Sequence, residues 1–160
     1  MNLSRLRALL PALVVVVADQ GTKAWAVNRL SGGRTIDLVG SLRFALGFNS
    51  GMAFSRGTGF GPYIGVLATA AVVAMVWSLR SHGSRLSGFG MALVIGGATG
   101  NLLDRFFRGG TFLHGSVVDF IDLQWFPAFN VADSGITVGG GLVVLSLVLS
   151  ERNSRKVVDA

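Results

Sequence analysis

The residues best suited to chemistry are aspartates that lie beside or within apolar stretches of the chain. Asp119 stands in Val-Val-Asp-Phe at 117–120, and Asp133 stands in Phe-Asn-Val-Ala-Asp-Ser at 129–134. A carboxylate at bilayer depth costs about 2.5–3.5 kcal/mol on insertion scales, so an acidic side chain there indicates a functional site. Two carboxylates held close together in a poorly hydrated site cannot both ionise easily, and they share a proton. Such a pair can activate water for attack on an amide carbonyl, with one group as general base and the other as general acid.

The two aspartates are separated by a short connection that leads into the last apolar stretch. Asp119 can therefore fold back beside Asp133 near one membrane face, and we predict that these two side chains are the catalytic pair. Asn130 precedes Asp133 by three residues and belongs to the same predicted site. A divalent cation between the two carboxylates is an alternative. However, the chain has no cysteine and no His-x-x-x-His spacing of the kind zinc hydrolases use, so we expect no metal and no cofactor.

A second polar group occurs in Gly-Asn-Leu-Leu-Asp-Arg at 100–105, near the end of another apolar stretch. Asn101 and Asp104 are three residues apart and share one face of a helix. We interpret Asp104 as the partner of Arg105 in a plain salt bridge, although Arg105 could instead anchor a phosphate or a substrate carbonyl. Asn101 has no charge to neutralise, so its position predicts a hydrogen bond to another polar group.

Two further segments could support such a site. Asp19 and Lys23 are four residues apart, which predicts an ion pair within one helix, with Asp19 organising the site rather than reacting. Asn49 and Gly51 open the segment Asn-Ser-Gly-Met-Ala-Phe-Ser at 49–55. The Asn-x-Gly turn followed by apolar residues indicates either a loop at the membrane surface or a substrate-binding loop.

The composition indicates a protein embedded in lipid. Of the 160 residues, 51% are hydrophobic and only 14% are charged, whereas a soluble domain usually carries about 25% charged residues. Apolar stretches of helix length occupy about 8–28, 60–79, 88–106 and 132–150. They are long enough for helices that cross a hydrocarbon layer of about 30 Å, and they lack the alternation of barrel strands. We therefore predict an all-α membrane protein with four transmembrane helices in a single integral-membrane domain, 1–160.

The segments between these stretches have their own patterns. Residues 35–39 and 42–46 are typical of two short strands separated by Gly40 and Ser41, which predicts a small extramembrane hairpin. Glycines are frequent in the third and fourth stretches, and small residues let membrane helices approach closely, so we expect these two helices to pack together. An aromatic cluster around 125–129 is typical of the membrane–water boundary.

The net charge of +6 does not indicate a nucleic-acid partner, because the basic residues form short clusters beside the apolar stretches. That placement suits the anionic surface of a membrane. Four spans place both termini on one side. The two sides carry equal numbers of Lys and Arg, so the count alone does not set the orientation. The tight flanking clusters on the side of the termini favour cytoplasmic termini.

Five segments, taken in order, resemble the five sequence boxes of the bacterial lipoprotein signal peptidases, also called signal peptidase II. They are Asp-Gln-Gly-Thr-Lys at 19–23, the segment 49–55, the segment 100–105, Val-Val-Asp-Phe-Ile-Asp at 117–122 and the segment 129–134. The likeness covers nearly the whole chain. Met52 stands where the family often has alanine, a difference that affects packing rather than chemistry.

The resemblance implies an aspartic endopeptidase of the bacterial inner membrane. Such enzymes remove the signal peptide from prolipoproteins whose cysteine carries a diacylglyceryl group, and they cut just before that cysteine. By position, Asp119 and Asp133 would be catalytic. The residues that would bind substrate or support the site are Asp19, Lys23, Asn49, Gly51, Asn101, Asp104, Arg105 and Asn130.

The resemblance also implies four transmembrane helices, a small periplasmic sheet and a short interfacial helix lying over the site. It implies cytoplasmic termini and a site near the periplasmic face. We expect a monomer whose partners are prolipoprotein substrates and membrane lipids, without nucleic acid.

Two alternatives follow from the residues themselves. A small membrane transporter or proton-conducting protein would spread its ionisable residues along a path across the bilayer. The candidates here cluster at one end of the apolar stretches instead. A membrane scaffold without catalysis would keep its function after substitution of Asp119 or Asp133 by asparagine.

Overall fold

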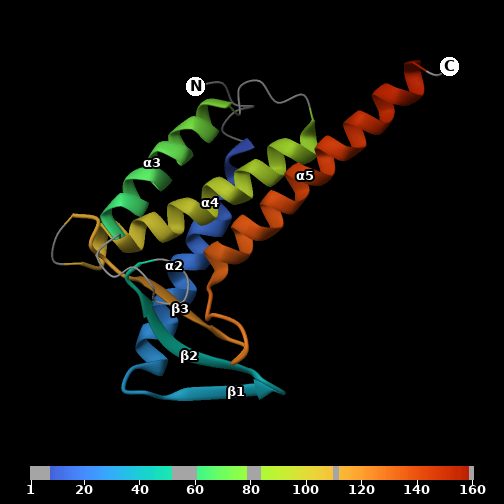
Figure 1. Ribbon diagram of the computed structural model, residues 1–160. Helices are drawn as coiled ribbons and strands as arrows, with labels where there is room; N and C mark the ends of the chain where they lie inside the picture. Colours follow the sequence, from blue (N-terminus) through green and yellow to red (C-terminus); the bar gives the residue numbers. More distant parts are fainter. Residues whose placement is uncertain (1–7, 52–60, 79–83, 110–111, 159–160) are drawn as a thin grey trace.

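The computed structural model describes residues 8–51, 61–78, 84–109 and 112–158. Within these residues the chain is mostly helical and carries a small three-stranded antiparallel sheet (Figure 1). The helices are α2 (Leu10–Leu30), α3 (Gly61–Ser78), α4 (Arg85–Phe107) and α5 (Val131–Val158). The strands are β1 (Thr35–Val39), β2 (Leu42–Asn49) and β3 (Val117–Asp122).

Helices lie over all four apolar stretches, and the last one continues to Val158 rather than ending near residue 150. Pro11 lies in the first turn of α2, where its missing N–H leaves no helical hydrogen bond unmade. Among the described residues, two helices are long and apolar enough to cross a membrane, Arg85–Phe107 and Val131–Arg152. Pro62–Ser78 of α3 is a shorter apolar helix. Membrane crossing by all four helices therefore stays a prediction.

Helices α4 and α5 lie side by side over much of their length (Figure 1). A Cβ atom on Gly97 of α4 would lie 2.2 Å from the carbonyl oxygen of Ala132 in α5, so a side chain at this position would collide with backbone. On the side facing α2, a Cβ atom on Gly100 would lie 2.6 Å from Oδ2 of Asp19. The predicted packing of the third and fourth stretches is confirmed, and glycine lets α2 and the start of α5 approach α4 closely.

The sheet has the strand order β1-β2-β3. The predicted hairpin is confirmed, with Gly40 in the left-handed region at φ 57° in its turn, and β2 continues to Asn49. The third strand is a finding that the sequence analysis missed, because it treated 117–122 as a connection. Strand β3 pairs with β2, and Gly47 lies opposite Asp119 in the ladder. The β-branched and aromatic residues of this segment were the available signal for a strand.

The sheet packs against the C-terminal half of α2. Trp25 of α2 meets Phe44 of β2 and Phe120 of β3 edge to face, with ring centroids 5.3 and 6.2 Å apart. Ala26 and Leu30 of α2 are fully buried and pack with Phe120 and Phe44. Strand β3, which carries Asp119, lies at the end of the bundle where α4 ends and α5 begins (Figure 1).

The short interfacial helix implied by the resemblance is not among the elements of the residues that the structure describes. Positions 52–55 of the candidate second box also lie outside the described residues.

Candidate active site

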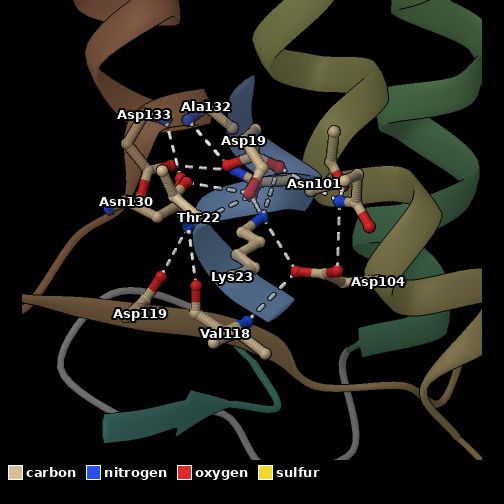
Figure 2. Close-up of polar contacts among 12 residues, drawn as sticks. Asp19, Thr22, Lys23, Asn101, Asp104, Val118, Asp119, Asn130, Ala132 and Asp133 are labelled. Carbon is tan, nitrogen blue, oxygen red and sulfur yellow. Dashed lines mark hydrogen bonds and ion pairs between the residues drawn. The ribbon is translucent and has the colours of Figure 1, made fainter. Parts of the chain in front are cut away.

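The structure brings Asp119 and Asp133 to one place. Both line a cavity of about 210 Å³ between the helices, and both line a groove of about 1100 Å³ between the sheet and α5. Asp119 is 6% exposed and Asp133 is half-buried. Asn130 lies immediately before α5, the helix that carries Asp133, and its Nδ2 donates a hydrogen bond of 2.7 Å to Oδ1 of Asp119 (Figure 2).

Asn130 and Asp133 form a reciprocal cap at the start of α5. Oδ1 of Asn130 accepts the backbone N–H of Asp133 at 3.0 Å, and Oδ2 of Asp133 accepts the backbone N–H of Asn130 at 3.2 Å. This arrangement is a capping box, with the acidic residue in the position that favours an anion near the helix N-terminus. Asp133 therefore lies in the first turn of α5, at the end of the apolar helix rather than deep within it.

Asn101 of α4 lies between a cation and a carboxylate. Its Nδ2 donates to Oδ1 of Asp133 at 2.8 Å, and its Oδ1 accepts a hydrogen bond from Nζ of Lys23 at 2.9 Å. Nδ2 of Asn130 also donates to that Oδ1 at 3.2 Å. The predicted hydrogen bond between Asn101 and another polar group is confirmed.

A fully buried charge cluster lies behind the pair. Nζ of Lys23 contacts Oδ2 of Asp19 and Oδ2 of Asp104, each at 2.8 Å, and none of these three side chains is exposed (Figure 2). The predicted ion pair between Asp19 and Lys23 is confirmed. The interpretation of Asp104 as a partner of Arg105 is wrong, because Asp104 pairs with Lys23 and, at 2.7 Å, with Nε of Arg108. Arg108 lies one helical turn beyond Asp104 on the same face, whereas the adjacent Arg105 projects in another direction.

The same two carboxylates also hold backbone groups beside the pair. Oδ1 of Asp19 accepts the N–H of Ala132 at 3.0 Å, immediately before Asp133. Oδ2 of Asp104 accepts the N–H of Val118 at 3.1 Å, immediately before Asp119. The charge cluster therefore fixes the backbone at both aspartates.

Gln20 and Arg108 are site-supporting residues that the sequence analysis did not single out. Nε2 of Gln20 donates to Oδ2 of Asp19 at 3.1 Å, to the carbonyl oxygen of Gly100 at 3.0 Å and to Oδ1 of Asp104 at 3.3 Å. The position of Gln20 next to Asp19, inside an apolar stretch, was the available signal. Arg108 had no such signal, because it follows the end of the apolar stretch.

Arg105 and Asn49 also line the smaller cavity, and Gly51 connects them by hydrogen bonds. Nη2 of Arg105 donates to the carbonyl oxygen of Gly51 at 3.1 Å, and the N–H of Gly51 donates to Oδ1 of Asn49 at 3.2 Å. Arg105 is 6% exposed, and its Nη1 is buried without a hydrogen-bond partner among the described residues. An unpaired buried donor is costly. The guanidinium therefore offers a hydrogen bond to a molecule in this cavity.

The surroundings of Asp119 change the pKa of its carboxyl group. Burial and the charge of Asp133 raise the pKa of Asp119 to about 6, while hydrogen bonds from Asn130 and Asn49 and the charge of Lys23 act in the opposite direction. Burial raises a carboxyl pKa because it disfavours the charged form. The pKa of Asp119 therefore lies nearer to neutral pH than that of an ordinary aspartate.

The larger groove is mostly apolar. Its walls include Phe48 of β2, Val138 of α5 and the predicted aromatic cluster, in which the rings of Trp125 and Phe126 lie 6.0 Å apart. Trp125 is 74% exposed. The carboxyl pair therefore lies where an open apolar groove meets a small cavity that contains a buried guanidinium.

Comparisons with known proteins agree with this geometry. Residues 11–149 match the signal peptidase (SPase) II family. The lipoprotein signal peptidase of Mycolicibacterium smegmatis is 43% identical over 147 residues, which is 91% of this chain and 62% of that protein's length. The lipoprotein signal peptidase of Mycobacterium tuberculosis H37Rv is 44% identical over 147 residues, 89% of this chain and 72% of that protein.

Solved structures show the same fold. A bacterial membrane enzyme solved by the in meso method at 2.3 Å resolution matches with a TM-score of 0.81 and 27% identity, over 92% of this chain and 90% of that one. A second bacterial membrane enzyme, solved by the same method at 1.9 Å resolution, matches with a TM-score of 0.75 and 28% identity, over 88% of this chain and 92% of that one. Together with its apolar helices, these matches identify the chain as a membrane protein. The chain belongs to the signal peptidase (SPase) II family, and it is an aspartic-type protease of that family.

Proposed function

We propose that this protein is an intramembrane aspartic endopeptidase that removes the signal peptide from prolipoproteins carrying a diacylglyceryl cysteine, cutting just before that cysteine. The observation that carries the proposal is the meeting of Asp119 and Asp133 where the apolar groove joins the small cavity. A lipidated cysteine keeps the scissile bond at the membrane surface, and a buried acid pair can activate water there without a mobile cofactor. The relatives from the two mycobacterial species are named for this activity.

The two aspartates have different roles in the proposed reaction. Asp133 is the general base, because the amide of Asn101 and the backbone N–H of Asn130 both donate hydrogen bonds to its carboxylate. It takes a proton from water as the water oxygen bonds to the scissile carbonyl carbon. Asp119 is the general acid and donates its proton to the carbonyl oxygen, which gives a tetrahedral gem-diol.

The second half of the reaction restores the pair. The amine nitrogen takes the proton from Asp133 as the C–N bond breaks, and one hydroxyl proton of the gem-diol returns to Asp119. Substrate in the groove excludes water, which raises the pKa of Asp119 further above its value of about 6 and keeps the acid protonated at neutral pH.

Arg105 binds the substrate in this proposal. Its Nη1 is buried and unpaired among the described residues, and Arg105 lines the cavity that both aspartates share. An oxygen of the bound substrate backbone accepts this hydrogen bond. The carbonyl oxygen of Gly51 accepts a hydrogen bond from Nη2 of the same guanidinium, and Oδ1 of Asn49 accepts the N–H of Gly51.

The membrane supplies the remaining surroundings. Large apolar side chains are exposed on the outer faces of the helices, among them Leu67 and Trp77 of α3 and Leu147 of α5. A surface of this kind needs lipid or another apolar partner. We propose that all four helices cross the inner membrane as a single domain and a monomer, with cytoplasmic termini and with the sheet and the site near the periplasmic face. The tight basic clusters on the side of the termini support this orientation.

The alternative of a small transporter or proton-conducting protein is not favoured. Asp19 and Asp104 both contact Lys23 in one cluster, instead of following a path along the helices. The match to the signal peptidase family also favours hydrolysis.

The proposal is tested with the purified protein in detergent and a prolipoprotein precursor. The precursor that carries the diacylglyceryl group should be cut, and mass spectrometry should place the new N-terminus at the lipidated cysteine. The same precursor without the lipid is the control and should stay intact. A chelator should leave the rate unchanged. Cleavage at another bond, equal cleavage of both precursors or a metal requirement would contradict the proposal.

A further inference from the structure

Lys23 uses every hydrogen-bond donor of its side chain inside the protein. Its Nζ contacts Oδ2 of Asp19 and Oδ2 of Asp104, each at 2.8 Å, and Oδ1 of Asn101 at 2.9 Å (Figure 2). An ammonium group has three N–H donors and no acceptor. Each of its three neighbours must therefore present an acceptor to it.

This requirement fixes the orientation of the Asn101 amide. Because Lys23 can only donate, the end of the amide that faces it is the carbonyl oxygen, and the NH₂ end faces Oδ1 of Asp133 at 2.8 Å. The hydrogen bond that Nδ2 of Asn130 donates to Oδ1 of Asn101 requires the same orientation. Oδ1 of Asp133 is therefore the acceptor in this contact.

Lys23 acts on the pair from a distance. It is fully buried and lines neither the groove nor the smaller cavity, so it does not touch a substrate bound there. Its hydrogen-bonded link to the carboxyl group of Asp133 runs through the amide of Asn101, whereas its ion pair with Asp19 leads to the backbone N–H of Ala132. The charge of Lys23 also acts on Asp119, where it opposes the effect of burial.

We propose that Lys23 is a positioning residue that, by orienting the amide of Asn101, makes Asp133 the base and leaves the shared proton on Asp119. This inference rests on the proposed function. Besides the pair itself, the charged groups that the described residues place around it are Asp19 and Lys23 from α2 and Asp104, Arg105 and Arg108 from α4.

The test uses two variants of Lys23. Lys23→Met removes the ammonium but leaves Asp19 and Asp104 without their common partner. Lys23→Met combined with Asp19→Asn leaves the net charge of the cluster unchanged, and the amide oxygen introduced by the second substitution can still accept the N–H of Ala132, so this double variant is expected to fold. Thermal unfolding in detergent shows which of the two variants folds, and that variant is analysed. Cleavage of the lipidated precursor is then measured across pH.

The inference predicts a fall in kcat of about tenfold or more, as for other groups that orient an acid–base pair, with KM for the lipidated precursor unchanged. The pH–rate profile should move to higher pH, because the charge of Lys23 lowers the pKa of Asp119 in the parent protein. A double-mutant cycle with Asn101→Ala should be non-additive, since both substitutions disrupt the same hydrogen-bonded connection from Lys23 through Asn101 to Asp133.

The inference is overturned if kcat is unchanged, if only KM rises, or if kcat falls with an unmoved pH profile and additive effects in the cycle. The last outcome would mean that Lys23 is only a structural support. Failure of the parent protein to cleave the lipidated precursor would instead remove the proposed function itself, so the two failures are distinct.

Discussion

Asp104 accepts the backbone N–H of Val118 at 3.1 Å, which ties α4 to the strand that carries Asp119. The same carboxylate pairs with Lys23 and Arg108 and is fully buried. A short strand at the end of a bundle would otherwise be held by its ladder and by packing against α2. The charge cluster therefore helps to position Asp119, one of the two candidate catalytic residues.

We predict that Asp104→Asn lowers the free energy of unfolding by about 3–5 kcal/mol, because it removes the buried counter-charge of Arg108 and leaves Lys23 paired with Asp19 alone. Thermal or denaturant unfolding in detergent measures the change. Asp122→Asn is the matched control, since Asp122 pairs with Arg43 in a partly exposed contact of 2.7 Å, and such pairs contribute about 0–1 kcal/mol. Equal losses for the two variants would contradict the role given to Asp104.

We predict that Gly97→Ala destabilises the protein by about 1–3 kcal/mol and slows cleavage, because the new methyl group would lie 2.2 Å from the carbonyl oxygen of Ala132. The start of α5, with Asp133, would have to move. Gly140→Ala on α5 is the control, because nothing lies within 4 Å of its Cβ position and alanine favours helix. A Gly97 variant as stable and active as the Gly140 variant would contradict the close packing of α4 and α5.

We predict that Asp119→Asn unfolds less readily than the parent protein at neutral pH, although it is inactive. The folded-state pKa of Asp119, about 6, lies above its ordinary value of 3.8, so the stabilisation of the folded state by its proton is complete below about pH 3.8. That stabilisation is lost as the pH rises through 6. The difference amounts to at most about 3 kcal/mol, at about 1.4 kcal/mol per pKa unit.

The measurement for this prediction is the free energy of unfolding of both proteins from pH 4 to pH 8. The advantage of Asp119→Asn should grow between about pH 4 and pH 6 and then level off. A stability difference that does not change with pH would show that Asp119 is not a carboxyl group with a raised pKa.

We predict that Arg105→Lys lowers kcat/KM for the lipidated precursor by about 10- to 100-fold. In Arg105, Nη2 contacts the carbonyl oxygen of Gly51 while Nη1 stays available for the substrate. Lysine keeps the charge but lacks this planar pair of donors. Steady-state kinetics compare it with Arg43→Lys, whose arginine pairs with Asp122 outside the cavity. Similar rates for the two variants would exclude Arg105 from substrate binding.

The sequence predicted those features that depend on local patterns. Apolar stretches located the helices, the residues around Gly40 located the hairpin, and a spacing of four predicted the ion pair between Asp19 and Lys23. The five boxes also identified most residues that gather at the site. Their catalytic and binding roles stay proposals.

What could not be predicted depends on contacts between distant segments. Strand β3 exists because 117–122 pairs with β2, which is remote in sequence. The partners of Asp104 are set by the approach of α2 to α4, which brings Lys23 and Gln20 to it. The unpaired Nη1 of Arg105 likewise follows from the tertiary arrangement of the cavity.

The most direct test of the central claim is cleavage of the lipidated precursor by Asp119→Asn and by Asp133→Asn. Asp37→Asn is the matched control, because Asp37 is an exposed carboxylate on β1 of the same sheet. If Asp119 and Asp133 are the acid and the base, each single substitution should reduce kcat by about a thousandfold or more, while Asp37→Asn keeps the parent rate. Normal turnover by either Asp119→Asn or Asp133→Asn would contradict the account.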